Sequence, residues 1–125
     1  MTKRILVVED HEDNRQMLRD LLTSAGFEMV EAVTGTDGVA MAKAQKPDLI
    51  LMDIQLPGIN GYEAARQIKA DAALKSVPII AVTSYALSGD AAKAFAAGCA
   101  AYVTKPYSPR QLLARIREHL PAEDE

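Results

Sequence analysis

Five polar side chains stand directly after short runs of apolar residues. They are Glu9 and Asp10, Asp53, Thr83, and Lys105. Carboxylates, a hydroxyl and an ammonium suit a divalent metal ion and a phosphoryl group, because hard cations prefer carboxylate oxygens and phosphoryl oxygens need positive charge and hydrogen-bond donors. This chemistry requires a fold that brings the five side chains together.

The apolar runs before these side chains have the composition of buried strands. They occupy residues 5–8, 49–52, 79–82 and 101–104. Runs of large apolar residues are typical of parallel sheets, whose two faces are both covered by helices. The carboxyl ends of parallel strands lie along one edge, which is where open α/β sheets bind ligands. A parallel arrangement therefore predicts one shared site at that edge.

Five segments between the runs carry helical spacing and helical end signals. The predicted capping residues are Asp13, Thr34, Asn60, Ser88 and Ser108. Thr34 and Asn60 have an acidic residue three positions later, and Ser108 precedes a proline, which are signals for a helix start. The first helix is expected to bury Met17, Leu18, Leu21, Leu22 and Ala25 and to stop at Gly26.

Segment 28–33 mixes polar and apolar residues, which favours a half-exposed edge strand. Five strands alternating with five helices predict an α/β fold, a (βα)5 doubly wound five-stranded parallel sheet. The fully apolar first, third and fourth strands belong at the centre of the sheet, and the more polar second and fifth strands belong at its edges. This distribution favours the strand order 2-1-3-4-5 of a flavodoxin-like fold.

Length and composition limit the function classes. The 125 residues predict one domain over residues 1–121 and a short acidic tail over 122–125. A net charge of −3 argues against nucleic-acid binding, and no apolar stretch approaches the length of a membrane span. The single Cys99 excludes an internal disulfide, fits a reducing cytoplasm and is expected to pack as a small core residue. We expect a monomer or weak dimer.

Each polar signal has an ordinary explanation when it is taken alone. Asp53 could cap a turn, Thr83 could cap a helix, Lys105 could be a surface charge, and the acidic loop 9–13 could be solvated. Pro106 favours a role for Lys105 in the site over a surface charge. An X-Pro bond can adopt the cis form, so Pro106 can fix the loop and direct the lysine inward. Four such signals at the ends of four strands favour a shared site. Mg²⁺ is the natural compensation for its crowded carboxylates.

The order and spacing of these residues resemble the receiver domain of two-component response regulators over essentially the whole chain. The resemblance rests on Val7-Val8-Glu9-Asp10, on residues 48–53 with Leu56-Pro57 and Gly61, on Thr83-Ser84, and on Lys105-Pro106. It implies that Asp53 accepts a phosphoryl group from a histidine kinase or a His-phosphotransfer protein. It also implies that Asp10, Asp53 and the backbone carbonyl of Gln55 bind Mg²⁺, with Glu9 acting through water.

The same resemblance implies roles for other residues. Thr83 and Lys105 would hold the phosphoryl oxygens, and Thr83 would move with Tyr102, the aromatic switch residue. Gln55 and Tyr85 occupy positions that tune the lifetime of the phosphoryl group in this family. The downstream protein would bind the face formed by the fourth helix, fifth strand and fifth helix.

The chain resembles single-domain regulators of the DivK type, which are phosphoacceptor signalling domains rather than enzymes. A receiver domain excised from a hybrid histidine kinase or a larger response regulator remains an alternative. A phosphatase with an Asp nucleophile is disfavoured, because it needs a second Asp where this chain has Gln55. A flavodoxin-like electron carrier is disfavoured because the acidic loop 9–13 would repel a flavin phosphate.

Overall fold

The computed structural model describes residues 2–84 and 90–120, and the sheet within them has five strands in the order β2-β1-β3-β4-β5. All neighbouring strands pair in parallel. The strands are β1 (Arg4–Val8), β2 (Glu28–Ala32), β3 (Leu49–Asp53), β4 (Ile79–Thr83) and β5 (Ala101–Thr104). The predicted fold class and strand order are confirmed.

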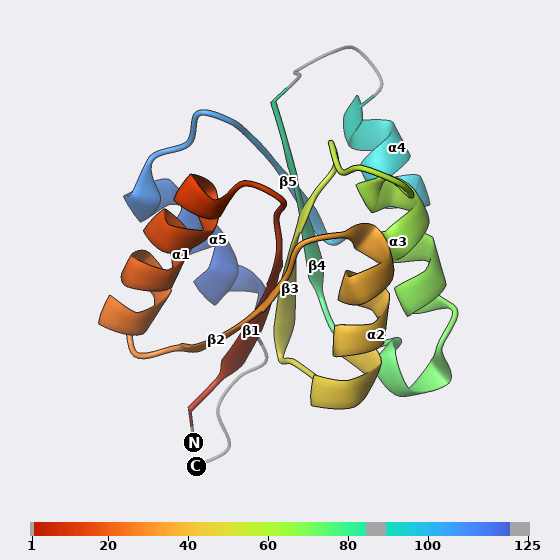
Figure 1. Cartoon of the computed structure of the whole chain (residues 1–125), viewed down its shortest axis with the longest axis horizontal. Helices are drawn as coiled ribbons and strands as arrows, with labels where there is room; N and C mark the ends of the chain where they lie inside the picture. The colour runs from red at the N-terminus through yellow and green to blue at the C-terminus, as the bar shows by residue number, and fades with distance from the viewer. Residues whose placement is uncertain (1, 85–89, 121–125) are drawn as a thin grey trace.

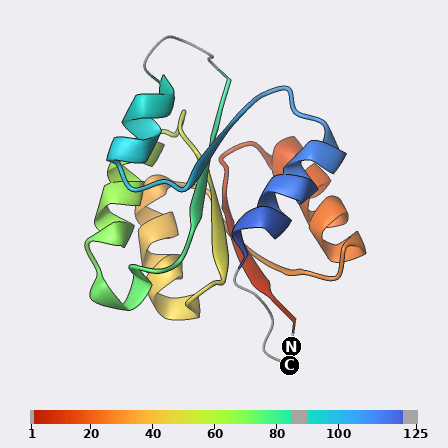
Figure 2. The same ribbon diagram turned by 180° about the vertical axis from the view of Figure 1, so that it is seen from behind.

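Helices cover both faces of this sheet. In the described ranges they are α1 (Glu12–Ser24), α2 (Gly35–Gln45), α3 (Gly61–Lys69), α4 (Asp90–Ala96) and α5 (Pro109–His119), with a short 3-10 helix, η1 (Ala72–Leu74). Helices α1 and α5 lie on one face, and α2, α3 and α4 lie on the other (Figure 1). The view from behind shows the same two layers (Figure 2). A sheet covered on both faces explains why its central strands are apolar throughout.

The burial pattern separates central strands from edge strands as predicted. Every residue of β3 and β4 is buried, whereas β2 is buried only at Ala32. The larger apolar layer lies between the sheet and α2, α3 and α4, and the smaller one lies between the sheet and α1 and α5. Cys99 is 5% exposed and belongs to the larger layer, which confirms that it packs as a core residue.

Three predicted helix caps are confirmed. Thr34, Asn60 and Ser108 each accept a hydrogen bond from the backbone N–H three residues later, over 3.0, 3.0 and 3.1 Å. These bonds satisfy N–H groups that have no partner inside the helix. The predicted cap Ser88 lies outside the described residues.

Two predictions for α1 are wrong. The capping position is His11 rather than Asp13, which lies inside the first turn. An acidic residue in that turn is favourable because the helix N-terminus carries partial positive charge. Met17 is 42% exposed, whereas Leu18 and Leu22 are buried. The helix contacts the sheet through this i, i+4 pair, and Met17 is rotated about 100° away from Leu18.

Gly61 allows α3 to begin against the end of β3. Its N–H donates to the carbonyl oxygen of Ile54 over 3.1 Å. A Cβ atom at Gly61 would lie 2.3 Å from the carbonyl oxygen of Asp53 and 2.8 Å from the Cα of Ile54. Both neighbours are backbone atoms, so neither can move without displacing the residues that form the strand end.

We expect Gly61→Ala to lower the free energy of unfolding by about 1–3 kcal/mol, the usual cost of forcing a methyl group into packed atoms. Urea denaturation at neutral pH measures this change. Gly58→Ala is the matched control, because a Cβ atom there meets no heavy atom within 4 Å and only the positive φ of 75° opposes it. Its cost should be about 1 kcal/mol. A Gly61→Ala protein as stable as wild type would contradict the close contact.

Candidate functional site

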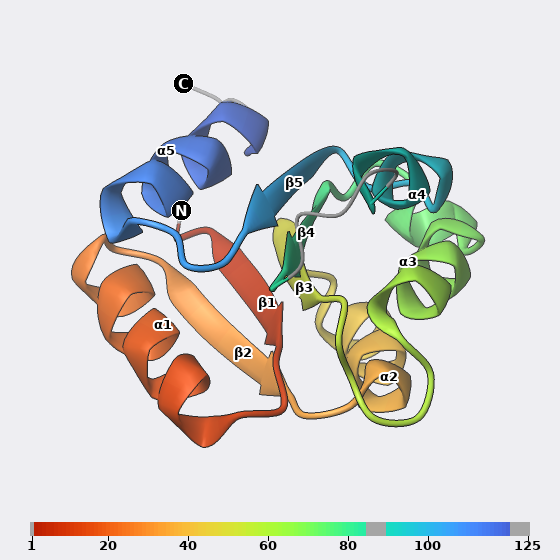
Figure 3. The ribbon, with the colours of Figure 1, turned by 90° about the horizontal axis from the view of Figure 1, so that it is seen from above.

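The carboxyl ends of the strands meet at one edge of the sheet, which Figure 3 views from above. Glu9 follows β1, Asp53 ends β3 and Lys105 follows β5. The Lys105 Nζ lies 3.0 Å from Glu9 Oε1 and 3.4 Å from Asp53 Oδ2. The Glu9 and Asp53 residues are only 3% and 4% exposed. The predicted convergence of these three side chains therefore exists in the structure.

Backbone contacts hold Lys105 at this edge. The Lys105 N–H donates to the carbonyl oxygen of Thr83 over 2.7 Å, which ties the end of β5 to the end of β4. The peptide bond between Lys105 and Pro106 is cis, the form considered for this proline. Only about a fifth of the lysine side chain is exposed, so the ammonium is directed into the site rather than into solvent.

Burial and mutual repulsion set the charge states of this cluster. Burial and the nearby charge of Glu9 raise the pKa of Asp53 to about 6, against the opposing effect of the Lys105 ammonium. Burial also acts to raise the pKa of Glu9, but hydrogen bonds from the His11 N–H and from Lys105 outweigh it, so this pKa is lowered. Burial acts to lower the pKa of Lys105, and its two carboxylate partners overcome that effect and raise it.

The raised pKa of Asp53 makes stability depend on pH. The folded protein holds this proton more tightly than the unfolded chain, so the free energy of unfolding falls as the pH rises from 3.8 to about 6. In metal-free buffer at pH 7.5, Asp53→Asn should therefore be more stable than wild type, by about 1–2 kcal/mol. Near pH 4 the two proteins should differ little.

Urea denaturation in EDTA at pH 4 and pH 7.5 measures this difference. Asp20→Asn is the control, because Asp20 is an exposed carboxylate of α1 away from the cluster. We expect it to be neutral at both values of pH. An Asp53→Asn protein that is less stable than wild type at pH 7.5 would show that the pairing of Asp53 with Lys105 outweighs burial and repulsion.

Gln55 joins the ends of β3 and β4. Its backbone N–H donates to Asp53 Oδ1 over 3.0 Å, and its side-chain Nε2 donates to Thr83 Oγ1 over 2.8 Å. Its Oε1 accepts from the Ser84 N–H over 3.0 Å. A backbone N–H can only donate, so this last bond fixes the orientation of the amide. Thr83 is 1% exposed. The sequence placed Gln55 near the site but gave no signal for its contact with Thr83.

The acidic loop after β1 holds a group of atoms that could bind a metal ion. Among the described residues, Glu9, Asp10 and His11 form a group of possible ligands whose atoms all lie within 4.8 Å of one another. His11 Nδ1 lies 3.1 Å from Asp10 Oδ1, and the Asp10 charge is the main cause that raises the pKa of His11. His11 was not among the residues predicted for the site. Asp53 lies outside this group of three, and its oxygens contact Gln55 and Lys105.

The oxygen-rich donor set fits Mg²⁺. The carboxylates of Glu9, Asp10 and Asp53 supply hard oxygen ligands, and the two buried ones carry more negative charge than Lys105 alone offsets. Mg²⁺ binds such sites through one or two carboxylates and retains several waters. The residues present are therefore consistent with the predicted cofactor.

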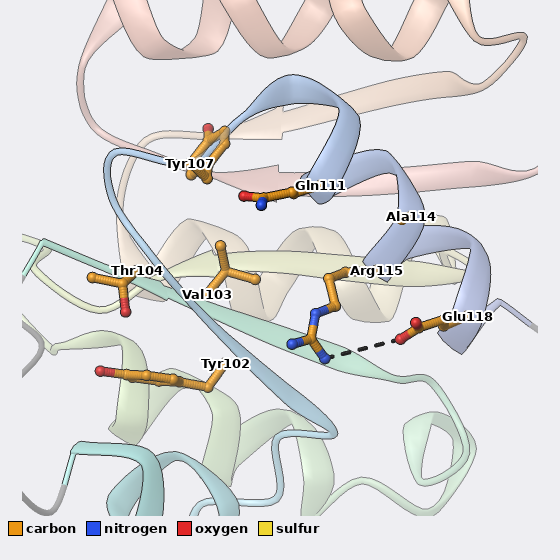
Figure 4. A pocket seen from close by; sticks show the side chains of 8 residues that line it. All are labelled: Tyr102, Val103, Thr104, Tyr107, Gln111, Ala114, Arg115 and Glu118. Atoms are coloured by element: carbon orange, nitrogen blue, oxygen red, sulfur yellow. Dashed lines mark ion pairs between the residues drawn. The ribbon is translucent and has the colours of Figure 1, made fainter.

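The proposed switch residue Tyr102 lies on β5, beside α5 (Figure 4). Its ring extends away from α5, whereas the neighbouring Val103 points toward Tyr107. Tyr102 is partly buried and packs against the larger apolar layer, which contains Ala94 of α4. Tyr85, which was predicted together with Gln55 to tune the lifetime of the phosphoryl group, lies outside the described residues.

Comparisons with known proteins agree with this geometry. The chain is 40% identical over 120 residues to the polar-differentiation response regulator DivK of Brucella ovis, covering 96% of this chain and 98% of that protein. It is 35% identical to the receiver domain of a sensor histidine kinase of Pseudomonas aeruginosa, whose crystal structure has a magnesium ion coordinated in the active site cleft. That match covers 95% and 98% of the two chains with a TM-score of 0.88.

A third similar structure is chemotaxis protein CheY4 of Vibrio cholerae, which is 27% identical over 96% of this chain and all of that one, with a TM-score of 0.91. No helix within the described residues has the length and apolar character needed to cross a membrane. Residues 5–117 match the response regulator receiver domain family. Together with the DivK relative, this match shows that the chain belongs to the family of response regulator receiver domains.

Proposed function

We propose that this chain is a response regulator that accepts a phosphoryl group on Asp53 from a histidine kinase or a His-phosphotransfer protein. The observation that carries the proposal is a buried carboxylate at the end of a central strand, 3.4 Å from the Lys105 ammonium. A carboxylate nucleophile yields an acyl phosphate, which is labile and suits a transient signal.

Lys105 and Thr83 are the proposed ligands of the phosphoryl oxygens. Phosphoryl transfer requires an in-line nucleophile and positive charge or hydrogen-bond donors around the equatorial oxygens. Lys105 already contacts Asp53 Oδ2, so a phosphoryl group on that carboxylate brings its oxygens within reach of the ammonium. The Thr83 hydroxyl stands at the end of the adjacent strand β4, where it accepts a hydrogen bond from Gln55 Nε2.

Mg²⁺ is the proposed cofactor, held by Asp10, Asp53 and the backbone carbonyl of Gln55, with Glu9 acting through water. When bound, it supplies positive charge that offsets the charge of the carboxylates and of the incoming phosphoryl group. The oxygen donors at the strand ends and the magnesium ion in the similar Pseudomonas aeruginosa receiver support this assignment.

The proposed output is a change in a protein-binding surface formed by α4, β5 and α5. Helix α4 carries Phe95, which is 53% exposed, and β5 carries the partly buried Tyr102. The 40% identity to DivK supports a regulator of that type. In this proposal, residues 1–121 form the receiver domain. The protein acts in the cytoplasm as a monomer or weak dimer. A phosphoacceptor domain of this kind signals by binding rather than by turning over a substrate.

The test is incubation of the purified protein with acetyl phosphate, followed by intact mass spectrometry. With Mg²⁺ present, the protein should gain one phosphate, and in EDTA it should gain none. A phosphate gained equally well in EDTA would contradict the role of the metal. A protein that stays unmodified under both conditions, and with phosphorylated His-phosphotransfer proteins, would contradict the phosphoacceptor function.

A further inference from the structure

A cation outside the cluster described above holds the acidic loop after β1. Arg15 lies in α1, and its Nη1 donates to the backbone carbonyl oxygen of Glu9 over 2.9 Å. That carbonyl belongs to the peptide unit that joins Glu9 to Asp10. The guanidinium therefore sets the orientation of the peptide between the two acidic residues, and with it the directions in which their carboxylates leave the backbone.

Other contacts hold the guanidinium in place. Its Nη2 donates to Glu12 Oε1 over 2.5 Å, and its Nε lies 3.2 Å from Glu31 Oε1 on β2. Arg19 donates to both oxygens of Glu31, over 2.8 and 2.7 Å, and so fixes that carboxylate in turn. The Arg15 side chain is only 12% exposed. A planar guanidinium that is already held by two carboxylates loses little further freedom when it binds a third group, so it is a rigid support.

The strand pairing shows what this support resists. The Glu9 N–H donates to the carbonyl oxygen of Ala32 over 3.0 Å, so the peptide before Glu9 is anchored to the end of β2. Beyond that bond the chain leaves the sheet and carries Glu9, Asp10 and Glu12 within four residues. These like charges repel one another and Asp53. Arg15 opposes that repulsion from α1 and binds the backbone of Glu9, whereas Lys105 binds its side chain.

We propose that Arg15 is a positioning residue of the phosphoryl-transfer site, which acts by fixing the Glu9–Asp10 peptide so that both carboxylates face the metal. This inference rests on the proposed function of the chain. It assigns to Arg15 no contact with the metal or with the phosphoryl group. The support of a ligand by a second residue commonly changes metal affinity by 10- to 100-fold.

If Arg15 acted only through its charge, its removal would change Mg²⁺ affinity in the opposite direction to the loss of a positioning residue. Removal of a positive charge near an acidic site raises the affinity of that site for a cation, because the Coulomb repulsion between the guanidinium and Mg²⁺ is lost. Loss of a support lowers the affinity, because the ligands no longer start in the binding arrangement. The direction of the change in Mg²⁺ affinity therefore separates positioning from charge.

The experiment measures the Mg²⁺ dissociation constant of the full chain by titration of its amide NMR signals. Arg15→Gln should bind Mg²⁺ about tenfold more weakly than wild type. Arg15→Lys keeps the positive charge but loses the planar guanidinium, so we expect it to bind Mg²⁺ more weakly than wild type as well. Arg19→Gln is the matched control, because Arg19 shares the partner Glu31, and within the described part of the chain its guanidinium bonds to Glu31 and Gln16 rather than to Glu9. Arg19 can affect Glu9 only indirectly, through Glu31, and its loss leaves the bond from Arg15 to Glu9 in place, so Arg19→Gln should bind Mg²⁺ within about twofold of wild type.

A second variant guards against a failure to fold. Glu31→Gln leaves Arg15 in the chain but removes the charge that holds its Nε, so it should weaken Mg²⁺ binding by less than Arg15→Gln. A Mg²⁺ dissociation constant that is unchanged or lower in folded Arg15→Lys and Glu31→Gln would overturn the positioning role. A loss of Mg²⁺ affinity in Arg19→Gln as large as that in Arg15→Gln would overturn it as well. If wild type itself bound no Mg²⁺, the proposed role of the metal in phosphoryl transfer would be wrong, and so would the proposed role of Arg15. Loss of affinity confined to the Arg15 and Glu31 variants would support both roles.

Discussion

Asp53→Asn should gain no phosphate from acetyl phosphate in Mg²⁺, while wild type gains one. The amide keeps the shape of the carboxylate but lacks a nucleophilic oxygen, so the bond to phosphorus cannot form. Removal of a nucleophile that acts with a metal and a cation as one unit typically costs several orders of magnitude in rate, so we expect labelling to fall by at least about 10³-fold. Intact mass spectrometry over a time course measures it directly.

Asp48→Asn is the matched control for this experiment. Asp48 lies immediately before β3, at the strand end opposite Asp53, and its carboxylate accepts a hydrogen bond from the Arg4 N–H over 2.7 Å. It should label as wild type does, because it lies far from the carboxyl edge of the sheet. If Asp53→Asn still gained one phosphate, the acceptor would be another residue, and loss of labelling in Asp10→Asn but not in Asp53→Asn would direct attention to Asp10.

The parts of the fold that follow from local physical chemistry were predictable from the sequence. A strand covered on both faces must be apolar throughout, so residues 49–52 identified a central strand, and the mixed segment 28–33 identified an edge strand. Helix caps depend on one side chain and one backbone N–H three residues away, which is why Thr34, Asn60 and Ser108 were predictable.

Features that depend on packing between elements were not predictable in this way. The spacing of apolar residues in α1 admits both Met17 and Leu18 on its buried face, and only the contact with the sheet decides that Leu18 and Leu22 are inside. The capping position of α1 depends on where the chain turns after Glu9. Asp13 has the right side chain for a cap, but it already lies one residue beyond the helix start.

The residues of the site show the same difference between what local sequence and topology predict and what depends on packing. Asp53, Thr83 and Lys105 were found because parallel topology alone brings strand ends together. The bond from Gln55 to Thr83 spans 28 residues, and the bond from Arg15 to Glu9 depends on the course of a loop and on a long side-chain rotamer. Residue types and spacing carry no signal for such contacts. Only the three-dimensional structure shows these contacts.

The second large effect is expected at Thr83. In the structure the Thr83 hydroxyl accepts a hydrogen bond from Gln55 Nε2 over 2.8 Å. A phosphoryl group on Asp53 presents charged oxygens, which attract the hydroxyl as a donor through a stronger, charge-assisted bond. The hydroxyl then directs its proton toward the phosphoryl oxygens, and Thr83 moves toward them. Movement of Thr83 leaves space behind it, which the Tyr102 ring on the neighbouring strand β5 can fill.

The packing of α4 makes it responsive to such a movement. The Tyr102 ring packs against the apolar layer that contains Ala94 and Ala97. Alanine side chains make few contacts, so a shift of α4 across this layer breaks little dispersion energy. A rotation of Tyr102 is therefore expected to displace α4 and to change the surface that α4, β5 and α5 form together.

An NMR shift map with and without beryllofluoride, a mimic of the phosphoryl group, tests this coupling. Wild type should show large shifts around Tyr102 and along α4. Thr83→Ala should still accept phosphate from acetyl phosphate yet lose most of those shifts, because the methyl group cannot bond to the phosphoryl oxygens. Thr104→Ala is the matched control, since Thr104 is the register partner of Thr83 on β5, and it should keep them. Shifts that persist in Thr83→Ala would show that the signal reaches α4 through a contact other than this hydroxyl.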